Sequence, residues 1–174
     1  TAVCEGEEIT FTAKEVEVTG ATCEWDFDGD EVIDATGQSV TYSYNESGTK
    51  TIKLLVSVGG GTCKAEDEIS VTINEKPVAT LTASESVCDG GTVTFTAGGG
   101  NTYSWTVTKD GADVNITETD NVIEFTAVGS YNVSVIAKSA DGCESDAVSA
   151  SATIFDKPVA TLTASESVCD GGTV

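Results

Sequence analysis

The sequence contains no histidine and no methionine among its 174 residues, and 29 acidic residues face only 8 basic ones. Without histidine, the Ser/His and Cys/His pairs of nucleophilic hydrolases cannot form, and a zinc site is disfavoured. The formal charge of −21 argues against nucleic acid and anionic membranes as partners, because both attract clusters of lysine and arginine. Neither a signal peptide nor a long apolar run is present, so we expect no membrane insertion of this segment. Because the chain begins with Thr1 rather than Met, we expect a mature product or a fragment of a longer protein.

Repetition is the strongest feature that the sequence does contain. The stretch "KPVATLTASESVCDGGTV" occurs at 76–93 and again, letter for letter, at 157–174. A looser copy, "TAVCEGEEITFTA" at 1–13, matches "ESVCDGGTVTFTA" at 85–97. The repeat predicts a first domain that lacks its first strand, a second domain, and the first strand and turn of a third, at residues 1–75, 76–156 and 157–174 respectively.

Each domain is predicted to consist of β-strands. Segments such as "VTFTA", "YSWTV" and "YNVSVIA" alternate polar and apolar residues with period two, and Thr and Val dominate them. Glycine-rich turns such as "CDGG" and "SADG" separate the segments, and no segment has a helical period. Seven or so short strands in about 80 residues predict an all-β fold of tandem, immunoglobulin-like, two-sheet sandwiches.

The stretch "WDFDGD" and the downstream "YSYNESGTKTIKLLV" together resemble the PKD (polycystic-kidney-disease) domain, an immunoglobulin-like sandwich. Lys50 stands where this family usually has tyrosine. The second domain has lost the acidic turn and is PKD-like only. The residues that carry the resemblance are Trp25, Asp26, Phe27 and Gly48 in the first domain, and Trp105, Gly129 and Tyr131 in the second.

The resemblance implies an extracellular setting, because such domains form tandem arrays in secreted enzymes and in large bacterial surface adhesins, here in the style of the Bacteroidota. We therefore expect a non-enzymatic structural repeat of a stalk, filament or adhesin shaft at a bacterial cell surface. Its partners would be other copies or neighbouring repeats, arranged head-to-tail. The alternative is an accessory module of a secreted enzyme that binds a glycan or a protein. An exposed aromatic platform would favour the module, but the aromatic residues fall at strand positions expected to face inward, Trp25 and Trp105 included.

The acidic stretch "WDFDGDEVID" is the candidate metal site. Asp26, Asp28, Asp30 and Asp34 offer hard oxygen ligands at spacings like those of a calcium-binding loop. An EF-hand is excluded, because glycine stands fourth instead of sixth and Gly37 takes the position of the final glutamate. A calcium site in a strand–turn remains one interpretation.

Two other interpretations of this stretch exist. Aspartate side chains in a turn can cap backbone amides without any metal. A pair of carboxylates could also act as the acid and base of a glycosidase, but that needs a cleft, which an exposed turn on a small sandwich does not provide.

The six cysteines predict disulfides in an oxidising compartment. Pairing within domains, Cys4 with Cys63 and Cys88 with Cys143, is the obvious arrangement, but strand order places such partners at opposite ends of a domain. A bridge needs Cα atoms within about 7 Å. We therefore predict an interdomain bridge between Cys4 and Cys143, and a bridge inside the first domain between Cys23 and Cys63. Cys88 and Cys169 would bond to later domains.

The end of the chain carries a spare copy of the first strand, "VATLTAS" at 159–165, whereas the first domain lacks one. A sheet edge without its strand is a template for a strand from elsewhere. We therefore predict that this segment adds to the first domain of a neighbouring copy, or begins the next domain of a continuous filament. Leu162 would face the core together with Ala160 and Ala164, on the opposite side from Val159, Thr161 and Thr163; Ser165 completes the segment.

Overall fold

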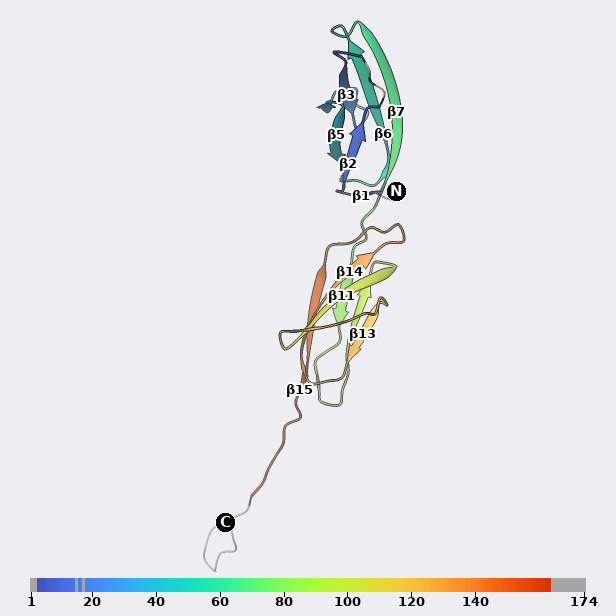
Figure 1. The fold of residues 1–174 in the computed structure, drawn as a ribbon. Helices are drawn as coiled ribbons and strands as arrows, with labels where there is room; N and C mark the ends of the chain where they lie inside the picture. Colours follow the sequence, from blue (N-terminus) through green and yellow to red (C-terminus); the bar gives the residue numbers. More distant parts are fainter. Residues whose placement is uncertain (1–2, 15, 17, 164–174) are drawn as a thin grey trace, which may run out of the picture.

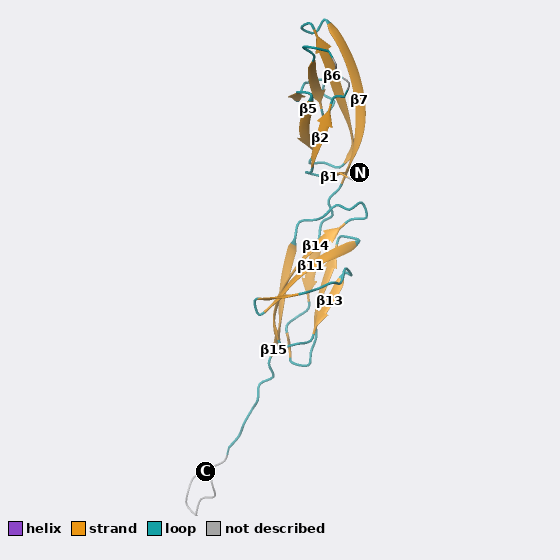
Figure 2. Cartoon of the chain, viewed as in Figure 1, coloured by secondary structure: helices purple, strands orange, loops and turns teal. Residues whose placement is uncertain are grey.

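The computed structural model describes residues 3–14, 16 and 18–163, and within these ranges it consists of strands and loops (Figure 2). None of the described residues lies in a helix that is long and apolar enough to cross a membrane. The strands up to Asn74 are β1 (Val3–Cys4), β2 (Glu8–Thr12), β3 (Thr22–Asp26), β4 (Ala35–Thr36), β5 (Ser39–Ser43), β6 (Gly48–Val58) and β7 (Cys63–Asn74). The remaining strands are β8 (Thr80–Ala83), β9 (Val87–Cys88), β10 (Val93–Gly98), β11 (Thr102–Lys109), β12 (Ala112–Val114), β13 (Val122–Phe125), β14 (Gly129–Lys138) and β15 (Val148–Phe155).

These strands form two sandwiches, which Figure 1 shows end to end. In the first sandwich a five-stranded sheet, β1-β7-β6-β3-β4, faces the pair β2-β5. In the second, the sheet β12-β11-β14-β15-β9 faces β13-β10-β8. The prediction of tandem all-β sandwiches is confirmed.

The two sandwiches share one plan, strand for strand, except at one edge. β2 and β10 are equivalent strands. On one side, β2 pairs with β5 and β10 pairs with β13. β10 also pairs with β8, whereas among the described residues β2 has no second partner. The edge of β2 is therefore open at the place where the sequence lacks the segment that forms β8.

Alternation along the strands builds a separate core in each sandwich. Tyr103, Trp105 and Val107 alternate with exposed residues on β11 and are buried in the second core. In the first core, Trp25 stacks on Phe27 at 6.2 Å between ring centroids, and Phe27 is fully buried. The indole N–H of each tryptophan donates to a loop carbonyl, so no polar tip is left unsatisfied. Both tryptophans are thus core residues.

In each sandwich the hydroxyl of a buried tyrosine donates a hydrogen bond to a backbone carbonyl, but the tyrosines are not at equivalent positions. In the second domain the Tyr131 hydroxyl donates to the carbonyl of Ala127 at 2.7 Å, four residues upstream. The first domain has Lys50 at the equivalent position, and its Nζ lies 5.8 Å from the centre of the Tyr44 ring. Tyr44 instead donates to the carbonyl of Phe27 at 3.0 Å. The hydroxyl thereby ties the strand end before β6 to the start of the acidic turn.

Alkaline pH is expected to destabilise the first domain through Tyr44. Burial raises the pKa of its phenol to about 12, and the neighbouring Tyr42, Asp34 and Asp26 add to the shift. The phenol is unperturbed in the unfolded chain, at about 10. Stability from the neutral phenol is therefore fully present below pH ~10 and declines as the pH rises toward about 12.

This prediction is checked by denaturant melts as a function of pH, with Tyr44→Phe as the comparison. The variant should be destabilised by about 1–3 kcal/mol at neutral pH, because the buried Phe27 carbonyl loses its donor. It should also lose less stability than the parent between pH ~10 and ~12. Equal losses in both proteins would contradict the assignment to Tyr44.

Candidate functional site: the acidic turn and the domain junction

The acidic turn follows directly from the end of β3. Cys23, Trp25 and Phe27 face the core, so Asp26 falls on the opposite side of the strand at the point where the chain leaves the sheet. Asp26 is nevertheless buried, at 4% exposure, beneath the turn that follows it. Gly29 adopts a φ of 79°, which closes the turn over this carboxylate.

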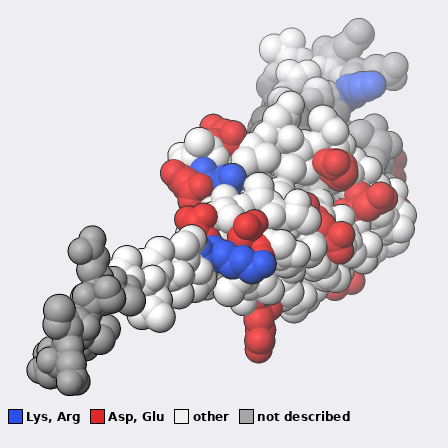
Figure 3. Space-filling view, turned by 90° about the horizontal axis from the view of Figure 1, so that it is seen from below, with Lys and Arg blue, Asp and Glu red and all other residues white. Residues whose placement is uncertain are grey.

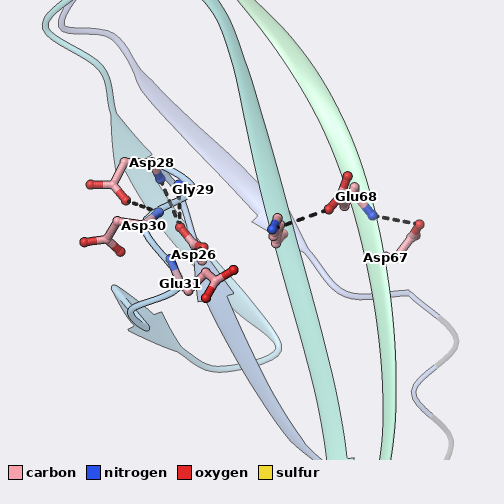
Figure 4. Close-up of polar contacts among 8 residues, drawn as sticks. Asp26, Asp28, Gly29, Asp30, Glu31, Asp67 and Glu68 are labelled. Atoms are coloured by element: carbon pink, nitrogen blue, oxygen red, sulfur yellow. Dashed lines mark hydrogen bonds and ion pairs between the residues drawn. The ribbon is translucent and has the colours of Figure 1, made fainter.

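Backbone amides surround the carboxylates of this turn (Figure 4). Asp26 accepts hydrogen bonds on both oxygens: Oδ1 from the amides of Asp28 and Gly29, and Oδ2 from the amide of Glu31. Asp34 reaches back to accept the amide of Phe27 at 2.7 Å. Aspartate side chains of this turn therefore do cap backbone amides, as one interpretation of the sequence expects.

The turn gathers three of the four predicted ligands. Asp26, Asp28 and Asp34 each offer a carboxylate oxygen, and these oxygens lie within 4.8 Å of one another. Asp30 is exposed and lies outside this group; its Oδ1 accepts the amide of Val32 at 2.8 Å instead. Within the part of the chain that the structure describes, no ion pair reaches any of the three clustered aspartates.

A hollow of about 240 Å³ lies beside the turn, on the outer face of β3, β6 and β7. Glu24, Glu31 and Glu66 line it, together with Lys53. Lys53 pairs with Glu68 at 3.8 Å across β6 and β7 (Figure 4). The hollow is thus a strongly acidic surface with one paired cation, unlike the aromatic platform of a glycan-binding module.

The second candidate is the junction between the two domains. A disulfide joins Cys4 of β1 to Cys143, which lies in the loop after β14, with Cα atoms 5.6 Å apart. The predicted interdomain bridge is therefore present. Cys143 is fully buried, and its sulfur also lies 3.8 Å from the carbonyl of Asn74, the last residue of β7.

Hydrogen bonds hold the connecting segment close to the bridge. The amide of Glu5 donates to the Asn74 carbonyl at 3.1 Å. The Glu5 side chain accepts the amides of Ser47 and Lys76, one on each oxygen. One glutamate beside the bridged cysteine thus ties the β5–β6 loop to the start of the linker.

The predicted bridge between Cys23 and Cys63 is wrong: both residues are free thiols in the structure. Cys23 on β3 pairs with Val56 on β6, and Cys63 on β7 pairs with Val58 on β6. Strand β6 therefore lies between the two cysteines. Two interstrand spacings of about 4.8 Å separate such residues by more than the ~7 Å limit of a disulfide.

The remaining predictions concern the downstream part of the chain. Cys88 is exposed and free, as expected if its partner lies in another domain. Val159 and Leu162 are 85% and 98% exposed, and residues 157–163 form no strand in this chain (Figure 1). Ala164, Ser165 and Cys169 lie outside the described residues. Addition of this segment to another copy therefore stays a prediction.

Comparison with protein-family models finds a similarity in the first domain. The family model described as "PKD domain" matches residues 1–73. No curated protein shows significant similarity to the chain.

Solved structures with a similar fold include fibronectin(III)-like modules of Clostridium thermocellum CbhA, at 18% identity and a TM-score of 0.42, covering 95% of this chain and 96% of that one. Three N-terminal domains of the bacteriophage RB49 outer capsid protein Hoc match at 21% identity and a TM-score of 0.41, covering 89% and 56%. The I-band fragment I67-I69 from titin matches at 16% identity and a TM-score of 0.47, covering 90% and 62%. These likenesses are to the fold alone.

Proposed function

We propose that this chain, whose residues 1–73 match the PKD domain, is a segment of an extracellular structural shaft at a bacterial cell surface. The shaft consists of β-sandwiches that follow one another head-to-tail and hold another part of the protein away from the surface. The observation that carries the proposal is the disulfide between Cys4 and Cys143, which fixes the end of one domain to the end of the next. A disulfide of this kind also indicates an oxidising compartment.

The letter-for-letter repeat supports continuation of the array. Residues 157–174 begin the same sequence that opens the second domain at 76–93. Repetition of one domain type adds length without adding chemistry, as expected of a spacer.

The surface favours the shaft over the binding module. Among the described residues, the only aromatic side chain among the exposed large hydrophobic ones is Phe155. Acidic side chains are spread over the visible end face, with few lysines between them (Figure 3). Such a surface keeps a long array soluble and offers no stacking platform for a sugar ring.

Head-to-tail order also explains the open edge of β2. In the second domain, Leu81 on β8 packs against the core and opposes Ala97 on β10. Leu162 repeats Leu81, and Ala13 repeats Ala97. A "VATLTAS" strand beside β2 would therefore place its leucine opposite Ala13.

Extension of the chain tests this arrangement. Placing a copy of residues 157–165 directly before Thr1 should raise the free energy of unfolding of the first domain by about 2 kcal/mol, the contribution of one buried leucine. The matched control carries aspartate at the copied Leu162 position and should give no gain. Equal stability of the extended and unextended chains in urea melts would contradict the proposed strand position.

We also propose that the acidic turn binds calcium through Asp26, Asp28 and Asp34. Their oxygens lie close together, and among the described residues their charge is offset by backbone amides and by no ion pair. Calcium takes carboxylate oxygens readily, in flexible geometries. The ion would brace the turn that Phe27 and Tyr44 anchor to the core.

Calcium is therefore expected to raise the melting temperature of the first domain and leave the second unchanged. At a free concentration 100-fold above the dissociation constant, the gain in stability is about 2.7 kcal/mol. Asp28→Asn should remove the shift, whereas Asp30→Asn, in the same turn but outside the cluster, should keep it. Calorimetry that finds no shift at millimolar calcium would remove the proposal.

A further inference from the structure

Among the described residues, the outer end of each domain exposes one thiol, and each thiol lies at a position equivalent to one that is bonded at the internal junction. Cys88 is exposed on β9 at the downstream end of the second domain. Cys63 is exposed at the start of β7, in the hairpin at the upstream end of the first domain. We propose that Cys63 forms a disulfide with the Cys88-type cysteine of a preceding domain of the same kind, so that every junction of the array carries the same covalent link. The inference rests on the proposed head-to-tail array.

The downstream ends of the two domains have the same backbone structure. Cys4 opposes Asn74 in a parallel pair of strands, and Cys88 opposes Phe155 in the same way. The residue after each cysteine donates its amide to the carbonyl of that opposing residue, at 3.1 Å after Cys4 and 2.8 Å after Cys88. Cys88 therefore occupies the position from which Cys4 reaches the next domain.

The upstream ends match through the alignment of the repeat. Residues 48–58 align with 129–139, and each hairpin that follows ends in a cysteine, as "GGGTC" at 59–63 and "ADGC" at 140–143. The hairpin of the first domain is one residue longer. Cys143 is fully buried against Cys4 and the end of β7, whereas Cys63 is exposed in the structure.

The proposed pair follows the arrangement of the bonded pair, Cys4 and Cys143. In both, a cysteine at the downstream end of one domain joins the hairpin cysteine of the next domain. Cys23 is excluded as a partner, because it is buried beside β6 and points into the core of its own domain. Formation of the new bond is a thiol–disulfide exchange. Cys63 and the partner cysteine each lose a proton and form one S–S bond, and the two electrons released reduce the disulfide of an oxidoreductase or of glutathione to two thiols.

The chain itself gives the first test. A mixture of isotopically labelled and unlabelled copies is oxidised with glutathione disulfide at high protein concentration, and the linked peptides are mapped without reduction. Cys63 of one copy should be joined to Cys88 of another copy, or to Cys169, which occupies the position of Cys88 in the repeated sequence. Exposed thiols that oxidise at random would give links between two Cys63 residues at a similar rate, and a majority of such links would overturn the proposal.

An extended chain gives the deciding test, because it supplies the tether of the natural array. Residues 76–165 are placed before Thr1, so that a copy of the second domain, followed by its own linker and strand, precedes the first domain. Most of Cys63 should then be bonded to the copied Cys88. Cys63→Ser should leave the copied Cys88 as a thiol, whereas Cys23→Ala should leave the bond intact.

Two results separate this inference from the proposed function. Cys63 remaining a thiol in the extended chain, while Cys4–Cys143 still forms, would overturn the inference and leave the array in place. Failure of Cys4–Cys143 to form in the folded chain would instead count against the proposed function itself.

Discussion

Replacing Cys4 and Cys143 together with serine is expected to destabilise both domains and to loosen their junction. The disulfide joins residues 139 positions apart, but each domain has a separate core. When one domain unfolds on a folded neighbour, the bridge and the linker close a loop of roughly 70 residues, for which chain entropy gives up to about 4 kcal/mol. Each domain should lose up to this amount of unfolding free energy.

Urea melts measure this loss one domain at a time, because Trp25 reports on the first core and Trp105 on the second. Cys88→Ser is the matched control, since it removes an exposed thiol at an equivalent position that forms no bond within the described chain. Its melts should coincide with those of the parent. A double variant as stable as this control would show that the bridge contributes nothing to folding.

Truncation of Phe27 to alanine is expected to be the most damaging single change in the first domain. Phe27 is fully buried between Phe11 and Tyr42, whose ring centroids lie 5.2 Å and 4.3 Å away. A cavity of this size costs about 3–5 kcal/mol. The loss should extend to the acidic turn, because the Phe27 amide donates to Asp34 and its carbonyl accepts from Tyr44.

Phe155→Ala is the matched control, because it makes the same phenylalanine-to-alanine change at an exposed position. Phe155 is 56% exposed at the end of β15, so its truncation should change stability by no more than about 0.5 kcal/mol. Calcium titration of both variants adds a second measurement, since Phe27→Ala should weaken any calcium-dependent stabilisation and Phe155→Ala should not. Similar losses of stability in the two variants would contradict the assignment of the core.

The features that the sequence predicts well are those that depend on local pattern. Alternation identifies Trp25 and Trp105 as core residues, and the strand pattern identifies the β-sandwiches that contain them. The interdomain bridge between Cys4 and Cys143 was also predictable, because it requires only the knowledge of which end of a domain each cysteine occupies.

The features that the sequence predicts poorly depend on lateral strand order and on turn geometry. Cys23 and Cys63 lie near the same end of the first domain, but only the sheet shows that β6 separates them. Asp30 has the spacing of a ligand, yet the turn directs it to the amide of Val32. The equivalence of Cys63 and Cys143 was present in the repeat, but it appears only when the alignment is continued through hairpins of unequal length.

The central claim, that adjacent domains are fixed end to end as parts of a stiff shaft, is tested most directly by ¹⁵N relaxation of the oxidised chain. Amides of both domains should report one common, elongated rotational diffusion tensor. In the variant with serine at Cys4 and Cys143, each domain should tumble faster and separately. Separate tumbling of the two domains in the oxidised chain, with the Cys4–Cys143 bridge intact, would contradict the account.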